Sequence, residues 1–238
     1  MLMGDVEADA LGRFLTSENS GLEIIAAPTR EQLDTACANP ESGTRLIALC
    51  SSVIVPGTHL EAIDCGIYNF HPGPPSYPGR YPSVFALYEA AKNFGVTVHH
   101  MVARVEEGPI VAAEWFPVPE YCDLETLDTL SFKALVSLFG RLAKPLATDP
   151  SPLRTKGIGW SGTKCSKTDC DVLCTVDAST SPAESEKRIR ACGPHLNWIT
   201  QPLGAGTRPT TKASTRAAPA RVRELAQSSS ASGGAGAV

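Results

Sequence analysis

Residues 68–82 read YNFHPGPPSYPGRYP, and this stretch predicts a strand followed at once by a stiff loop. Its first residues continue from Gly66–Ile67 and fit an extended strand. Side chains alternate along a strand, so Asn69 and His71 share one face. The prolines after His71 lack an N–H and have a fixed φ, which excludes a helix or a central strand. The sequence therefore places an amide and an imidazole side by side at the rim of a sheet.

The composition is that of an ordinary globular protein. The chain has 238 residues, of which 42% are apolar and 19% charged, enough for one domain with an appendage. A formal net charge of −4 does not favour nucleic acid as the principal partner. The first residues contain neither the basic nor the apolar region of a signal peptide, and no apolar run has membrane-spanning length. We therefore expect a cytoplasmic protein whose 8 cysteines are reduced thiols.

Strand and helix patterns alternate along the first part of the chain. The run 45–56 is apolar almost throughout, as in a strand buried on both faces of a parallel sheet. We expect an α/β fold, in which a mostly parallel sheet carries helices on both faces. Ligands in such folds bind at the carboxyl ends of strands, where His71 lies. The other expected strands are 21–28, 68–71, 95–105 and 110–118, and the expected helices are 6–15, 29–38, 83–94 and 123–146.

The character of the chain changes near residue 150. Residues 151–203 hold polar clusters and one clear helical pattern over 181–192, so we expect a small, poorly structured extension. Residues 204–238 are rich in Ala, Gly, Ser and Thr, which is typical of a disordered tail. The first domain is accordingly expected over residues 1–150. The change also leaves open that the residues after 150 are not the natural partner of this domain.

Two common cofactor signals do not occur in this sequence. The spacing of Cys165, Cys170 and Cys174 is not that of a zinc site, so we expect free thiols and no metal. The first turn, around Gly4, lacks the glycine-rich fingerprint of dinucleotide-binding proteins, which argues against a nicotinamide cofactor.

Three short blocks follow one another in a distinctive order. They are Asn69, His71, Pro72, Gly79 and Pro82 in the first block, Gly95, Val96, Thr97 and His99 in the second, and Gly108, Pro109 and Ile110 in the third. Together they resemble the 10-formyltetrahydrofolate-dependent formyltransferases, which include methionyl-tRNA formyltransferase, glycinamide ribonucleotide transformylase and the sugar N-formyltransferases. The resemblance covers about residues 1–145 and implies a Rossmann-like formyltransferase fold.

The sequence departs from the family pattern in two places. The loop after His71 is one residue shorter than usual, and Glu106 stands where the family has Asp. The extra methylene of Glu moves the carboxylate by about 1.5 Å unless the backbone adjusts. A displacement of about 1 Å can cost roughly 100-fold in rate, so a weakened site is one interpretation and an adjusted backbone is the other.

The resemblance implies catalytic roles for Asn69, His71 and Glu106. Attack of an amine on the formyl carbon creates an oxyanion, which the amide and the imidazole can stabilise. The Glu106 carboxylate would orient the imidazole and take a proton from the amine. His99 is expected to be structural or to support its neighbours. The residues that the resemblance implies for the folate slot are Cys50, Ser51, Ser52, Val53, Ile54, Val55, Val102 and Val105.

The sequence thus predicts formyl transfer from the co-substrate 10-formyltetrahydrofolate to a small-molecule amine. An amino sugar or a nucleotide-linked amine is favoured over methionyl-tRNA, because the net charge is negative and the segment after 150 is short. Two alternatives stay open: hydrolysis of formyltetrahydrofolate by the same three residues, and folate binding without turnover.

Overall fold

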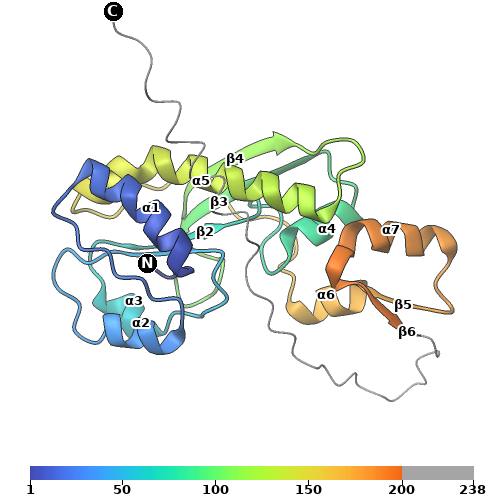
Figure 1. Cartoon of the computed structure of the whole chain (residues 1–238), viewed down its shortest axis with the longest axis horizontal. Coiled ribbons are helices and arrows are strands. Elements are labelled where there is room, and N and C mark those ends of the chain that lie inside the picture. Colours follow the sequence, from blue (N-terminus) through green and yellow to red (C-terminus); the bar gives the residue numbers. More distant parts are fainter. Residues whose placement is uncertain (200–238) are drawn as a thin grey trace, which may run out of the picture.

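A four-stranded sheet forms the centre of the molecule (Figure 1). The structure is a computed structural model that describes residues 1–199, so the tail predicted over 204–238 lies outside the described residues. The strands follow one another in the sheet in chain order. They are β1 (Leu46–Leu49), β2 (Ile67–His71), β3 (Asn93–His100) and β4 (Ile110–Pro117).

The strand directions make this sheet a mixed one. Strands β1 and β2 are parallel, and Leu2 adds a parallel bridge to Ala48, but the pairs β2–β3 and β3–β4 are antiparallel. The expectation of a mostly parallel sheet therefore holds only on the β1 side. Residues 101–109 join β3 to β4 and are too few for the crossover that a parallel pair needs.

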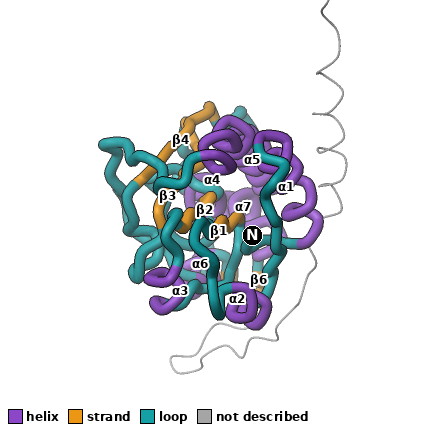
Figure 2. Tube along the Cα trace, turned by 90° about the vertical axis from the view of Figure 1, so that its left-hand side faces the viewer, coloured by secondary structure: helices purple, strands orange, loops and turns teal. Residues whose placement is uncertain are grey.

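Helices cover both faces of the sheet, as the α/β fold class predicts. Helices α1 (Asp5–Glu18) and α5 (Leu124–Thr148) lie side by side on one face (Figures 1 and 2). Their apolar side chains pack on Phe70, Val96 and Val98 of the sheet. On the opposite face, α2 (Arg30–Ala36) and a loop that contains α3 (Gly57–Ala62) cover β1 and β2.

Several elements are shorter than the sequence pattern suggests. Strand β1 ends before Cys50 and helix α4 (Pro82–Tyr88) ends before Ala90, and both residues have a left-handed backbone, with φ of 50° and 55°. Such a conformation is uncommon for residues other than glycine and interrupts either kind of element. Residues 21–28 do not form the expected strand. They run extended beside Met1, whose carbonyl accepts from the Ala27 N–H at 2.9 Å, and one residue is too short a partner for a ladder.

The segment after residue 150 contains more regular structure than the one helix that we expected. That helix, α7 (Pro182–Cys192), is present. The sequence pattern missed α6 (Lys167–Leu173), because seven residues are too few to show a helical stripe. Two three-residue strands, β5 (Thr175–Asp177) and β6 (Asn197–Ile199), form a parallel pair, and a 3₁₀ turn at Gly193–His195 leads to the second.

The cysteines are not all free thiols, which corrects the sequence-based expectation. Cys174 and Cys192 form a disulfide that joins the ends of α6 and α7. Their Cα atoms lie 5.5 Å apart, a normal distance for this bond. The bond could not be foreseen because the two residues are far apart in the sequence and no alternation or motif pairs them.

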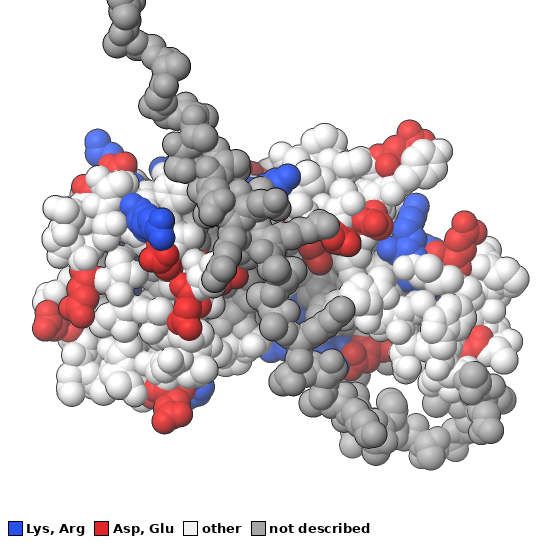
Figure 3. Space-filling view, in the orientation of Figure 1, with Lys and Arg blue, Asp and Glu red and all other residues white. Residues whose placement is uncertain are grey.

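Charged side chains of both signs occur on the face of the described residues that Figure 3 shows. On the face shown in Figure 3, the described Lys and Arg residues lie among Asp and Glu residues. Within residues 1–199, no helix combines the length and the apolar character needed to cross a membrane.

Candidate active site

The loop after β2 is fastened to the body of the protein at several points. The Pro72 carbonyl accepts from the Ser131 hydroxyl of α5 at 2.9 Å, and the Gly73 carbonyl accepts from the Thr97 hydroxyl of β3 at 2.8 Å. Both donors are buried. The prolines and glycines of this loop are therefore held in one arrangement before any ligand binds.

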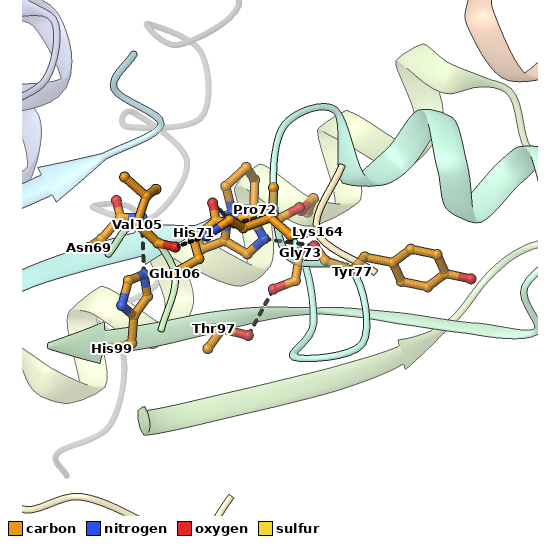
Figure 4. A network of polar contacts seen from close by, with 12 residues as sticks. Asn69, His71, Pro72, Gly73, Tyr77, Thr97, His99, Val105, Glu106 and Lys164 are labelled. Atoms are coloured by element: carbon orange, nitrogen blue, oxygen red, sulfur yellow. Dashed lines mark hydrogen bonds and ion pairs between the residues drawn. The ribbon is translucent and has the colours of Figure 1, made fainter. Parts of the chain in front are cut away.

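The structure brings Asn69, His71 and Glu106 together (Figure 4). Strand β2 presents the first two on one face, as the alternation predicts, and the β3–β4 loop carries the third. The His71 Nδ1 lies 3.1 Å from the Glu106 Oε1, and its Nε2 lies 3.1 Å from the Tyr77 carbonyl oxygen. Both oxygens only accept, so both hydrogen bonds form only when both ring nitrogens carry a proton. The arrangement therefore suits a positively charged imidazole beside a carboxylate.

Glu106 sits in an unusual backbone conformation that aims its side chain at His71. Its φ is 55°, in the left-handed region. The backbone N–H of Gly79 donates to the second carboxylate oxygen, so the acid also holds the far end of the Pro/Gly loop. In this conformation, the longer side chain of Glu106 reaches both His71 and the Gly79 N–H.

The surroundings of Glu106 keep its carboxylate charged. Burial by itself raises the pKa of this group, but the hydrogen bond and charge of His71 and the N–H of Gly79 outweigh that effect and lower the pKa from its usual 4.5. A depressed pKa stabilises the folded protein above pH 4.5, and that contribution disappears as the pH falls through the lower value. Glu106 is thus ionised at neutral pH and available to accept a proton.

His99 orients the amide of Asn69, a role that the sequence left unspecified. The His99 Nδ1 donates to the His100 carbonyl at 2.8 Å, which leaves Nε2 free to accept from the Asn69 Nδ2 at 3.2 Å. This tautomer requires a neutral ring. Burial lowers the pKa of His99 to about 4, with the nearby charge of His71 adding to the effect. The family block that contains Thr97 and His99 indicated that His99 matters to the site. Only the fold shows that its hydrogen-bond partner is the Asn69 amide.

We expect the buried neutral His99 to make stability depend on pH. The unfolded chain takes up this proton near pH 6.5 and the folded chain only near pH 4, so stability is full above 6.5 and falls by about 3 kcal/mol on the way to pH 4. Urea unfolding at a series of pH values measures the slope. His99→Gln, which has no proton to take up, should flatten that part of the curve. Identical slopes for the two proteins would contradict this assignment.

A cavity lies beside Asn69 and Glu106 and is lined by most of the residues expected in the folate slot. It has a volume of about 110 Å³ and is lined in part by Asn69, His99 and Glu106. Exposed apolar side chains, among them Ile54 and Val105, form its rim. Of the residues expected in the slot, only Cys50 does not line it. Those that do are Ser51, Ser52, Val53, Ile54, Val55, Val102 and Val105, and the sequence did not anticipate Ala48, Leu60, Arg80 or Met101.

Residues 156–165, here called the covering segment, run across the Pro/Gly loop. The Ser161 N–H donates to the Pro75 carbonyl at 2.8 Å, and the Cys165 N–H donates to the Pro78 carbonyl at 3.1 Å. Arg80 returns a hydrogen bond from its N–H to the Cys165 carbonyl at 2.7 Å. The sequence gave no signal for these contacts, because they are made by backbone groups of a polar stretch.

The described residues were also compared with the groupings that bind metal ions. Within residues 1–199, no three His, Cys, Asp or Glu side chains are grouped so that they could hold a metal ion.

Comparisons with known proteins agree on one family. The family model described as "Formyl transferase" matches residues 22–134. The methionyl-tRNA formyltransferase of Rhodopirellula baltica is 30% identical over 104 residues, which cover 43% of this chain and 31% of that protein. The chain spans between 31% and 56% of the length of the curated relatives that it matches.

Solved structures show the same fold at low sequence identity. A sugar N-formyltransferase from Shewanella sp. FDAARGOS_354 superposes with a TM-score of 0.67 at 13% identity, over 91% of this chain and 96% of that one. An N-formyltransferase from Helicobacter canadensis, in complex with folinic acid and dTDP-3-aminofucose, gives a TM-score of 0.59 at 16% identity, over 79% and 77%. These likenesses confirm the expected fold.

Proposed function

Because the chain belongs to the formyl transferase family, we propose that it transfers a formyl group from 10-formyltetrahydrofolate to the amine of a small-molecule acceptor. The observation that carries this proposal is the convergence of Asn69, His71 and Glu106 beside one partly apolar cavity. An amide donor, an imidazole that can hold a positive charge and an ionised carboxylate are the groups that acyl transfer to an amine requires.

Each of the three residues has a distinct part in the proposed reaction. The amine nitrogen bonds to the formyl carbon, and negative charge collects on the formyl oxygen. The Asn69 amide and the His71 imidazole stabilise that oxygen. Glu106 takes the proton that the amine nitrogen loses. The bond between the formyl carbon and the folate nitrogen then breaks, that nitrogen takes up a proton, and tetrahydrofolate leaves.

The cavity suits the flat ring system of a folate. Its walls combine apolar side chains such as Val53 and Val102 with backbone groups of an irregular chain, as ligand pockets commonly do. The Helicobacter canadensis relative of this fold was solved with folinic acid bound, which supports a formyl folate as the co-substrate here.

An amino sugar or a nucleotide-linked amine is the acceptor that we favour over methionyl-tRNA. Sugar N-formyltransferases are among the structures that superpose along most of the described chain. The formal net charge of −4 also favours a small acceptor, because tRNA binding depends on basic side chains. Cytoplasmic location remains a prediction.

Folinic acid should stabilise the protein against heat if the cavity is the folate slot. At 100 times the dissociation constant, a ligand adds about 2.7 kcal/mol to the free energy of unfolding, so the melting temperature should rise by several degrees. Ile54→Glu at the rim should weaken this response. Ile25→Glu, which changes a similarly exposed isoleucine outside the cavity, should keep it. An equal loss in both variants would speak against binding at this place.

The activity itself is tested by following release of tetrahydrofolate from 10-formyltetrahydrofolate, with and without a panel of amines. Release that depends on an amine establishes the transferase and begins to identify the acceptor. Release at the same rate without amine indicates the hydrolase. Binding of the folate without release indicates the folate-binding protein without turnover.

A further inference from the structure

Trp160 brings the covering segment into contact with the candidate catalytic residues. Its ring centroid lies 5.8 Å from that of His71, at an interplanar angle of 72°, and 5.0 Å from that of His99, at 83°. One indole thus packs edge-on against both imidazoles. Sequence position gives no hint of this, because Trp160 lies beyond the three family blocks and in a stretch of glycines and polar residues.

The indole is held by its own hydrogen bond and by the attachments of the covering segment. Its Nε1 donates to the Gly108 carbonyl at 2.8 Å, which ties it to the loop that carries Glu106. Farther along the segment, the Lys164 ammonium donates to the Val105 carbonyl at 2.6 Å, and the Cys165 N–H donates to the Pro78 carbonyl of the Pro/Gly loop. The covering segment as a whole therefore connects the two loops, with Trp160 between its points of attachment.

The indole helps to keep water away from these imidazoles. His71 and His99 are each only 2% exposed, although His71 lies at the end of its strand. Trp160 itself is half-buried and is not among the residues that line the folate cavity. Asn69 and Glu106 do line that cavity, so the indole does not separate them from a ligand bound there.

We propose that Trp160 is a positioning residue that shields the formyl centre from water and so favours transfer over hydrolysis. This inference rests on the proposed function. In the competing reaction, the oxygen of water bonds to the formyl carbon and the bond to the folate nitrogen breaks. The folate nitrogen takes up a proton, and formate and tetrahydrofolate are released. A water molecule admitted beside His71 would meet the same stabilising groups as the amine, so excluding it is the available means of discrimination.

The test compares two products in the full chain: tetrahydrofolate released and amine formylated. In the wild type we expect their ratio to be near one. Trp160→Ala should raise the ratio, and should also raise amine-independent release of tetrahydrofolate several-fold. Trp160→Phe keeps an aromatic ring over the imidazoles and should restore most of the coupling. Trp115→Ala, at an exposed tryptophan on β4, is the matched control and should behave as the wild type.

The outcomes separate this inference from the proposed function. If Trp160→Ala merely loosens the structure, both products decline in proportion, the ratio stays near one, and the shielding role is wrong. If the wild type already releases tetrahydrofolate equally fast without amine, the shield does not exist. If the wild type consumes no 10-formyltetrahydrofolate with any amine, the proposed function fails and this inference fails with it.

Discussion

Replacing His71 with alanine is expected to lower kcat for amine formylation by about 10³-fold, with little change in affinity for folinic acid. The loss of one preorganised group that stabilises an oxyanion costs roughly 10²–10³ in kcat. The cost should lie at the upper end here, because Glu106 would lose the partner that its carboxylate faces at 3.1 Å. His71 does not line the folate cavity, so binding of the co-substrate should persist.

The measurement is single-turnover formylation beside a binding titration with folinic acid. His59→Ala is the matched control, because His59 also faces a carboxylate, that of Asp34 at 2.7 Å, but lies on α3 outside the catalytic loops. We expect that control to retain normal activity. A His71→Ala protein that binds folinic acid and still formylates at a rate close to that of the wild type would exclude the proposed role.

Shortening Glu106 to aspartate is expected to reduce kcat by about 10²-fold, even though aspartate is the residue usual in the family. The carboxylate would withdraw by about 1.5 Å from His71 and from the Gly79 N–H, and a catalytic displacement near 1 Å costs about that factor. In the present backbone conformation, the glutamate side chain is long enough to contact both partners. Glu106→Gln removes the base itself and should cost about 10³-fold.

The neighbouring Glu107→Asp provides the control, because Glu107 is exposed and pairs with Lys164 and Arg104 at the surface. An increase in activity for Glu106→Asp would show the opposite of our expectation: that the site is weakened by its longer acid. Protonation of Glu106 should not lower the wild-type rate until the pH falls below 4.5, because its pKa lies under that value.

The sequence predicted the position of those site residues that belong to a single strand or to a single family block. Alternation alone placed Asn69 and His71 on one face, and the family resemblance supplied Glu106 and most of the cavity. Their catalytic assignment remains a prediction, as does the domain boundary at residue 150. What alternation could not show is the partner of each group: His99 serves Asn69 only because β2 and β3 pair in the register that sets these two residues opposite each other.

The parts that the sequence did not reveal depend on backbone conformation and on contacts between distant segments. Cys50 and Ala90 have a left-handed backbone conformation. A strand and a helix end just before them, although the apolar pattern continues. The mixture of parallel and antiparallel strand pairs depends on the lengths of the connecting loops, which the hydrophobic pattern does not show. Helix α6 offered one readable signal, the capping box of Ser166 and Asp169, although such a short motif predicts little by itself.

The covering segment has a consequence for the order in which the protein matures during synthesis. All four strands of the central sheet have been made by residue 117, and α5 by residue 148. The Pro/Gly loop acquires its partners from residues 161 and 165 only later, and His71 acquires the indole of residue 160. A nascent chain can thus complete its sheet on the ribosome while its reactive centre is still open to water.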